Sequence, residues 1–373
     1  MKEELEELKK SNLYRSLKSI KIENPFAYVN GRKCLLLCSN DYLGLSSDIR
    51  VINAAKEHLS HLSQCSSRLI AGNDPLIEEF EYELAKHKGY DRALVYPNGY
   101  MANLAISSLV NKDDLILSDE LNHASIIDAC KLSKARVLVY KHNSLEDLDR
   151  KLKEKGRSKL VVTEGVFSMD GDFMKRDIAK IARENGALLV VDDAHGDFIY
   201  GSNFKGIQEE LRIDADIIIS SMSKALGTFG GYIASRKEII EYMINRSRSF
   251  IYTSALPSYL AAASLEALKI SKEGSKQKIL LESVSKIKKG LTDLGFRIKG
   301  ESHIIPIMIG SEITALNISD YMLENGIFIQ AIRYPTVAMN NARLRLTLTS
   351  LHHPYIDDIL IKFKLLPLNS SLK

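Results

Sequence analysis

The stretch Ala187-Leu-Leu-Val-Val-Asp-Asp-Ala-His-Gly196 begins with an apolar run and ends with two acidic residues and a histidine. A second apolar run, Ala215-Asp-Ile-Ile-Ile219, leads into Ser220-Ser-Met-Ser-Lys224. Short β-branched runs of this kind are typical of strands buried in a parallel sheet. Because open α/β sheets bind ligands at the carboxyl ends of their strands, we expect Asp192, His195 and Lys224 to lie at one such edge.

These three side chains suit pyridoxal phosphate. Lys224 can form a Schiff base with its aldehyde, Asp192 can keep its pyridine nitrogen protonated, and His195 can reach its ring hydroxyl. A lysine alone is a weak motif, so the prediction depends on the Asp192 and His195 pair. Two other interpretations stay open, because Asp192 can cap a helix and Asp192, Asp193 and His195 can bind a divalent metal ion.

Apolar runs alternate with helical patterns from about residue 46 to residue 270. The alternation predicts an α/β fold with a mostly parallel sheet covered by helices on both faces. The expected strands are residues 92–96, 114–118, 136–140, 159–164, 187–192, 217–221 and 231–234.

With 373 residues, the chain is long for one hydrophobic core, so we expect a smaller second domain. Residues 1–45 are predicted to form an N-terminal helix over about the first 20 residues, followed by short strands. Residues 46–270 are predicted to form the large domain, and residues 271–373 a small C-terminal α+β domain.

Composition argues against several classes of protein. The net charge of +4 is small and dispersed, which argues against nucleic-acid binding. No run reaches the roughly 20 apolar residues of a membrane span, and the charged N-terminal stretch lacks the apolar segment of a secretion signal. Four scattered cysteines indicate neither a disulfide framework nor a zinc site. We therefore expect a reduced, cytoplasmic protein without a metal ion.

A phosphate site is predicted where a strand runs into a helix at Tyr96-Pro-Asn-Gly-Tyr100. The first turn of a helix offers backbone N–H groups to an anion, although a plain turn with an asparagine cap fits the same residues. Hydroxyl groups at Ser221, Thr253 and Ser254 are further candidates for binding the phosphate.

Arg343-Leu-Arg345 alternates, which places both arginines on one face of a strand. A guanidinium group there is suited to bidentate binding of a carboxylate. In isolation, a surface strand with two charges is the simpler interpretation.

Five segments together resemble the α-oxoamine synthases, and the resemblance is collinear from about residue 35 to residue 352. These are fold-type I pyridoxal-phosphate enzymes, which condense an amino acid with an acyl thioester and release carbon dioxide. The resemblance also implies a homodimer with shared active sites. The segments are Asn40-Asp-Tyr-Leu-Gly-Leu45, Ser67-Arg-Leu-Ile-Ala-Gly-Asn73, Thr163-Glu-Gly-Val-Phe-Ser-Met-Asp-Gly-Asp172, Val191-Asp-Asp-Ala-His-Gly196 and Ser223-Lys224.

The resemblance implies a role for each matching residue. Lys224, Asp192 and His195 have the roles given above, His123 stacks on the ring, and Thr253 and Ser254 reach the phosphate in the neighbouring subunit. The four implied catalytic residues are His123, Asp192, His195 and Lys224. The implied cofactor-binding residues are Asn98, Gly99, Tyr100, His123, Glu164, Ser168, Asp192, His195, Ser221, Lys224, Thr253 and Ser254. The implied substrate-binding residues are Arg15, Asn40, Thr336 and Arg345.

Within the family, residues 331–337 and 342–348 favour L-alanine and a pimeloyl thioester of coenzyme A or acyl carrier protein as substrates. The chain departs from the family pattern at residues 64–66, at Ile77 and at residues 338–341. These residues lie where the family is expected to recognise the acyl chain and the thioester, so the departures bear on the identity of the acyl donor. The alternatives are a glycine C-acetyltransferase, a non-catalytic binding subunit of the same fold, and a metal-dependent enzyme.

Overall fold

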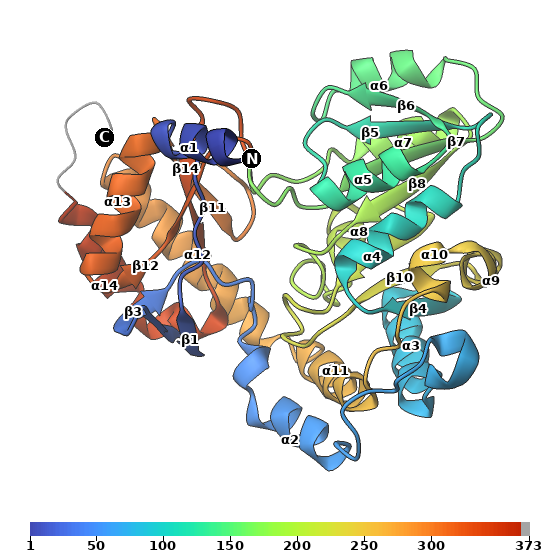
Figure 1. Ribbon diagram of the computed structural model, residues 1–373, viewed down its shortest axis with the longest axis horizontal. Helices are drawn as coiled ribbons and strands as arrows, with labels where there is room; N and C mark the ends of the chain where they lie inside the picture. Colours follow the sequence, from blue (N-terminus) through green and yellow to red (C-terminus); the bar gives the residue numbers. More distant parts are fainter. Residues whose placement is uncertain (367–373) are drawn as a thin grey trace. The chain divides into compact units, whose positions relative to one another are not determined.

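The computed structural model describes residues 1–366 and divides into two compact units (Figure 1). The larger unit consists of Leu45–Phe167 and Phe173–Gly274. The smaller unit consists of Met1–Gly44, the short segment Ser168–Asp172 and the chain from Ser275 onwards. The sequence did not predict that Ser168–Asp172, which follows a strand of the larger unit, belongs with the smaller one.

The larger unit is built on a seven-stranded sheet in the order β4-β10-β9-β8-β7-β5-β6. The strands from β9 to β6 pair in parallel, whereas β10 runs antiparallel to both β4 and β9. Figure 1 shows β5, β7 and β8 side by side. The strands are β4 (Arg92–Tyr96), β5 (Leu115–Asp119), β6 (Arg136–Tyr140), β7 (Lys159–Glu164), β8 (Ala187–Asp192), β9 (Ile217–Ser221) and β10 (Gly231–Ser235).

Helices surround this sheet, and Leu160, Val190, Ile217 and Ile233 lie in the core that they share with it. Branched apolar side chains on the central strands account for this burial, because such strands are covered on both faces. The helices are α2 (Ile49–Glu57), α3 (Pro75–Lys88), α4 (Gly99–Leu104), α5 (Ala124–Leu132), α6 (Leu145–Leu152), α7 (Asp177–Glu184), α8 (Ile207–Leu211), α9 (Lys237–Arg246), α10 (Arg248–Ile251) and α11 (Ser258–Ser271).

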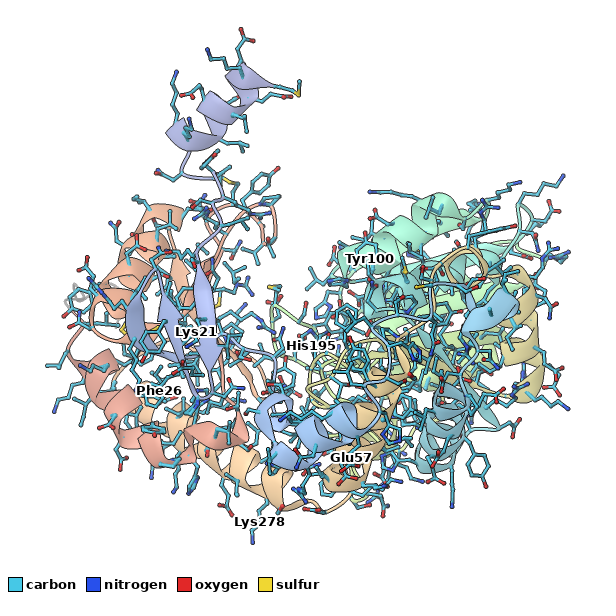
Figure 2. All side chains as sticks on the ribbon, turned by 60° about the horizontal axis from the view of Figure 1, so that its bottom comes forward. Lys21, Phe26, Glu57, Tyr100, His195 and Lys278 are labelled. Atoms are coloured by element: carbon cyan, nitrogen blue, oxygen red, sulfur yellow. The ribbon has the colours of Figure 1, made fainter. Side chains whose placement is uncertain are left out.

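The smaller unit holds two sheets. One has the order β1-β2-β3-β12, with β1 (Ile20–Glu23), β2 (Phe26–Val29), β3 (Arg32–Leu36) and β12 (Ile327–Phe328). The other has the order β11-β14-β13, with β11 (Ile304–Gly310), β14 (Ala342–Thr347) and β13 (Gln330–Ile332). Its helices are α1 (Lys2–Lys10), α12 (Ser275–Asp293), α13 (Glu312–Glu324) and α14 (Ile356–Lys364). Figure 2 shows Lys21 and Phe26 on the first of these sheets.

The N-terminal helix is shorter than predicted and ends at Lys10. Asn12 has a φ of 60°, a left-handed conformation that does not continue a helix, and Leu17 is fully exposed. The apolar spacing of residues 13–17 therefore misled the helix prediction. Within the described residues, no helix has the length and apolar character needed to cross a membrane.

Candidate active site

A cavity of about 220 Å³ lies where β7, β8 and β9 end and where α4 and α5 begin. Most of the predicted cofactor residues meet in it, as expected for the carboxyl edge of a parallel sheet. Figure 2 labels two of its residues, Tyr100 and His195. The lining residues are Asn98, Gly99, Tyr100, Asn103, His123, Ser125, Glu164, Asp192, Ala194, His195, Ile219, Ser220, Ser221, Ser223 and Lys224.

Lys224 and His195 lie in direct contact, with 2.9 Å between Nζ of the lysine and Nε2 of the histidine. Lys224 stands on the loop that follows β9. This loop is closed by a 3.0 Å hydrogen bond from the Met222 amide to the Gly230 carbonyl. A turn then forms where the Gly227 amide donates to the Lys224 carbonyl at 2.9 Å. The loop therefore holds the lysine amine beside the imidazole.

Asp192 is the last residue of β8, and its exposed fraction is 7%. Its Oδ2 atom accepts a hydrogen bond from Nδ2 of Asn103 at 2.6 Å, and its Oδ1 atom accepts one from the Ala194 amide at 3.0 Å. Asn103 also donates to the hydroxyl of Ser125 at 2.9 Å. Donors on both oxygens orient the carboxylate and stabilise its negative charge.

Asn103 was missed as a site residue by the sequence analysis, although it lies close to the predicted phosphate motif. It stands four residues after Gly99 on α4, and residues with this spacing share a helix face. That spacing is the signal that identifies it.

His123 caps the start of α5, and its Nδ1 atom lies 2.7 Å from the hydroxyl of Ser125. Burial lowers the pKa of His123, the nearby Lys224 adds to this effect, and Asp192 opposes it. A neutral imidazole ring is suited to stacking on a flat cationic ring, because it brings no second positive charge.

The other end of the cavity is formed by Asn98, Gly99 and Ser221. The side chain of Asn98 accepts a hydrogen bond from the Met101 amide at 2.9 Å and so caps α4. A Cβ atom placed on Gly99 would lie 3.0 Å from Cβ of Ser221, so a larger residue would fill this end. The hydroxyls of Ser221 and Ser223 lie 2.8 Å apart. Small residues, hydroxyl groups and a helix start suit a phosphate group.

The donor set of this cavity therefore fits pyridoxal phosphate. It contains a primary amine, a buried carboxylate, two imidazole groups and a narrow polar end, which are the groups that such a cofactor requires. Among the described residues, no group of three or more histidine, cysteine, aspartate or glutamate side chains is arranged to hold a metal ion.

Thr253 and Ser254 are absent from the residues that line this cavity. Ser254 is exposed, and Oγ1 of the half-buried Thr253 lies 3.6 Å from the sulfur of Met101. Within one chain, these two hydroxyl groups are therefore separate from the cavity residues.

In the smaller unit, the structure brings Asn40, Ser168 and Arg345 together. Arg345 donates to the Ser168 carbonyl at 2.7 Å and to Oδ1 of Asn40 at 3.2 Å. Arg15 and Thr336 meet elsewhere in this unit, through a 3.0 Å hydrogen bond from the guanidinium to the hydroxyl. The four predicted substrate residues thus form two pairs.

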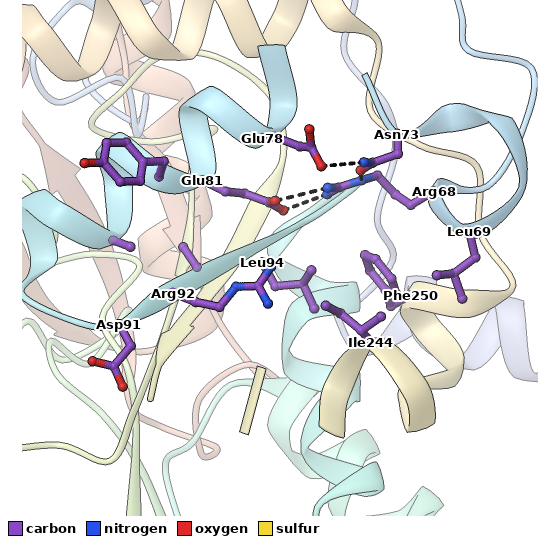
Figure 3. A pocket seen from close by; sticks show the side chains of 13 residues that line it. Arg68, Leu69, Asn73, Glu78, Glu81, Asp91, Arg92, Leu94, Ile244 and Phe250 are labelled. Carbon is purple, nitrogen blue, oxygen red and sulfur yellow. Dashed lines mark hydrogen bonds and ion pairs between the residues drawn. The ribbon is translucent and has the colours of Figure 1, made fainter. Parts of the chain in front are cut away.

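A second cavity, of about 440 Å³, lies in the larger unit beside α3 and β4 (Figure 3). Arg68 lines it and binds both carboxylate oxygens of Glu81, at 2.6 and 3.0 Å. The same guanidinium donates to Oδ1 of Asn73 at 2.7 Å. The charge of Arg68 is therefore balanced within the chain, and no predicted cofactor residue lines this cavity.

A doubly wound sheet with a lysine, an aspartate and a histidine at its carboxyl edge defines a pyridoxal-phosphate enzyme of fold type I. The sequence pattern of the aminotransferase class I and II family matches residues 32–361. The chain belongs to this family, and within it to the α-oxoamine synthases. The predicted family and fold class are thus confirmed.

Three similar proteins illustrate this relationship. An 8-amino-7-oxononanoate synthase of Thermoanaerobacter pseudethanolicus is 42% identical over 364 residues, which cover 94% of this chain and 92% of the relative. A structure of serine palmitoyltransferase from S. paucimobilis with bound PLP–myriocin matches with a TM-score of 0.91 at 30% identity, covering 97% and 95% of the two chains. A structure of 8-amino-7-oxononanoate synthase from Francisella tularensis matches with a TM-score of 0.75 at 30% identity, covering 89% and 97%.

Proposed function

We propose that this protein condenses L-alanine with a pimeloyl thioester, giving 8-amino-7-oxononanoate, carbon dioxide and a free thiol, in the biosynthesis of biotin. The thiol is coenzyme A or acyl carrier protein. The observation that carries the proposal is the contact between Lys224 and His195, in one cavity with the buried Asp192. Relatives that bear the name of this enzyme match almost the whole chain at about 40% identity, which supports the choice of reaction.

The cofactor is pyridoxal phosphate, which when bound supplies an electron sink next to the α-carbon of the amino acid. Lys224 would hold its aldehyde carbon, Asp192 its ring nitrogen and His195 its ring hydroxyl. His123 would lie against the ring face, and Asn98, Gly99, Tyr100 and Ser221 would surround the phosphate. Glu164 lines the same cavity.

The amine of Lys224 is the general base of the proposed reaction. A lysine amine removes a proton from carbon efficiently only if it is neutral at the working pH, and neighbouring groups adjust this property. The imidazole of His195, 2.9 Å away, is placed to exchange a proton with this amine. Once the amino group of L-alanine takes its place on the aldehyde carbon, the freed Lys224 amine would remove the proton from the α-carbon, and it would return a proton after carbon dioxide has left.

Arg345 is the proposed receptor for the carboxylate of the amino acid. Its exposed fraction is 6%, and among the described residues its hydrogen-bond partners are the Ser168 carbonyl, the Asn40 amide and the Tyr42 hydroxyl, with no ion pair. A buried cation without an anionic partner is costly, so the site favours an incoming carboxylate. Arg343, on the same strand, is already paired with Asp170 at 2.7 Å. Arg345 is therefore the arginine that is available to a substrate carboxylate, a distinction that the sequence pattern alone does not make.

We also propose that the enzyme is a cytoplasmic homodimer. All four cysteines are free thiols, as expected for a reducing compartment. Thr253 and Ser254 are the residues proposed to complete the phosphate site of the neighbouring subunit, which agrees with their position outside the cavity of their own chain. Mixing a Lys224→Ala protein with a Thr253→Ala/Ser254→Ala protein tests this arrangement. In shared sites, the mixture regains activity that neither variant has alone.

The proposed reaction is tested by incubating the holoenzyme with L-alanine and pimeloyl-coenzyme A, and by measuring both 8-amino-7-oxononanoate and released thiol. Equal amounts of the two products support the proposal. Turnover with glycine and acetyl-coenzyme A but not with L-alanine would instead identify a glycine C-acetyltransferase. Pimeloyl-acyl carrier protein, used in parallel, identifies the preferred carrier.

A further inference from the structure

A buried ion pair lies close to the turn that carries His195. Nζ of Lys88, the last residue of α3, lies 2.6 Å from Oδ1 of Asp197, and the exposed fractions of the two side chains are 0% and 1%. Lys88 also donates to the carbonyl of Lys205, and Oδ2 of Asp197 accepts a hydrogen bond from the hydroxyl of the buried Tyr232 on β10. Because desolvation offsets much of the attraction, a buried ion pair is weak evidence for added stability.

The turn after β8 places its side chains in two directions. The amides of Gly196 and Asp197 both donate to the carbonyl of Asp193, at 3.1 and 2.8 Å, as in one turn of a helix. In such a turn, residues four apart share a side and the residue midway between them faces away. Asp193 and Asp197 therefore share one side, while His195 lines the cavity on the other.

Asp193 is enclosed on this inner side. Its Oδ2 atom accepts a hydrogen bond from the Ile207 amide at 2.8 Å. Cβ atoms placed on Gly165, Gly196 and Gly206 would come within 2.7, 2.4 and 2.0 Å of its carboxylate oxygens. Burial raises the pKa of Asp193 well above its ordinary value, Lys88 opposes this effect, and Asp197 adds to it. Among the described residues, Lys88 forms its ion pair with Asp197 and not with Asp193.

Phe198, which follows Asp197, is held in an unfavourable backbone conformation. Its φ of 60° lies in the left-handed region, which residues other than glycine keep only where their surroundings enforce it. The ring of Phe198 stacks on His87 at 5.7 Å, and Nζ of Lys88 lies 5.5 Å from its centre. The end of α3 therefore enforces the geometry of this turn.

We propose that Lys88, Asp197 and Tyr232 are positioning residues, which fix the His195 turn from the side opposite the cavity and so set the distance between His195 and Lys224. The network connects α3, the turn after β8 and strand β10, so a displacement of any of them is transmitted to His195. This inference rests on the proposed function, because His195 acts there on the cofactor and on Lys224.

The position of His195 is read from the pH dependence of the holoenzyme's visible absorbance. The titratable groups that line the cavity with His195 are Glu164 from β7, Asp192 from β8, His123 and Tyr100 at the starts of α5 and α4, and Lys224 after β9. A displacement of the His195 side chain changes its interaction with Lys224. It therefore changes the pH midpoint, which is the pH at which the absorbance change is half complete.

The test compares Lys88→Met with the double variant Lys88→Met/Asp197→Asn, and uses Lys86→Met as the control. Lys86 lies two residues before Lys88, on the opposite face of α3, and its side chain is 68% exposed. We expect Lys88→Met to lower kcat by about 10- to 100-fold with little change in KM for L-alanine, because small displacements of a catalytic group have effects of this size. The pH midpoint shifts in the same variant, whereas Lys86→Met behaves like the wild type.

The double variant removes both buried charges, so we expect it to recover thermal stability but neither kcat nor the pH midpoint. Tyr232→Phe, which removes a single hydroxyl, is expected to change the pH midpoint in the same direction as Lys88→Met but to a smaller extent. This variant replaces Lys88→Met in the test if Lys88→Met does not fold. A double variant that regains kcat and the pH midpoint together with stability overturns the inference. A wild-type protein without visible absorbance after addition of pyridoxal phosphate would overturn the proposed function as well.

Discussion

Nζ of Lys224 lies 2.9 Å from Nε2 of His195, so the amine and the imidazole are within proton-transfer distance. Both groups follow neighbouring parallel strands of one sheet, β9 and β8. The contact joins two segments that the sequence indicated separately as strand ends. It gives the lysine a neighbour that can accept or return its proton.

Replacing this lysine removes both the covalent anchor and the base. We expect Lys224→Ala to abolish the visible absorbance of the holoenzyme and to lower kcat by about 10³-fold, the scale of general-base catalysis. Lys237→Ala, an exposed lysine of α9, is the matched control. A Lys224→Ala enzyme that keeps its visible absorbance would contradict the assignment of the anchor.

Asn103 is predicted to control how tightly the cofactor is held. Asn103→Ala removes the 2.6 Å hydrogen bond to Asp192. Hydrogen bonds to charged groups contribute about 1.5–3 kcal/mol, so the affinity of the apoprotein for pyridoxal phosphate is expected to fall about 10- to 100-fold. Titration of the apoprotein by fluorescence measures this change. Unchanged affinity would mean that Asp192 is oriented without Asn103.

The two arginines of β14 are predicted to respond differently to the same substitution. Arg345→Lys keeps the charge but loses the planar guanidinium group, which can bind a carboxylate through two parallel hydrogen bonds. We therefore expect kcat/KM for L-alanine to fall about tenfold or more. Arg343→Lys weakens the pair with Asp170 and lowers the unfolding temperature, while KM for L-alanine stays close to that of the wild type. Steady-state kinetics and calorimetry separate the two effects. Equal increases in KM would contradict the proposed division of roles.

We predict that the free energy of unfolding falls in acid because of two buried histidines, His87 and His352. Burial lowers the pKa of His87 and of His352 from 6.5 to about 4. Between pH 6.5 and about pH 4, the unfolded chain therefore binds more protons than the folded chain. The folded state is accordingly at full stability above pH 6.5 and loses stability as the pH falls towards 4. At about pH 5, each histidine is expected to cost roughly 2 kcal/mol of stability relative to about pH 7.5.

Calorimetry of the apoprotein across this range measures the effect. His87→Phe preserves the contact with Phe198 and is expected to flatten the pH dependence, whereas the exposed His58→Gln leaves it unchanged. An unfolding temperature that does not vary over this pH range would contradict the prediction.

The larger sheet was predictable in detail because its strands are short, apolar and β-branched. The predicted bounds match β4, β6, β7, β8 and β9 residue for residue. The apolar pattern of a strand does not show whether the strand runs parallel or antiparallel to its neighbours. The short connection from Ser221 to Gly231 contains no helix, which is the one indication that β10 is antiparallel to β9.

The parts of the site that were not predicted depend on tertiary contacts. Asn103 is an ordinary polar helix residue until β8 brings Asp192 within 2.6 Å of it. Arg343 and Arg345 are equivalent in the sequence, and only the pairing of Arg343 with Asp170 distinguishes them. The link from Lys88 to Asp197 connects residues 109 positions apart, which no local pattern encodes.

The central claim is a pyridoxal-phosphate enzyme that uses Lys224 to join L-alanine to a pimeloyl thioester. The most direct measurement is the absorbance spectrum of the wild-type holoenzyme, recorded before and after addition of L-alanine and then of pimeloyl-coenzyme A, together with that of Lys224→Ala. We predict a visible band that depends on Lys224 and responds to L-alanine, with release of 8-amino-7-oxononanoate once both substrates are present. A protein without a visible band after addition of pyridoxal phosphate, or one whose band ignores L-alanine, would contradict this claim.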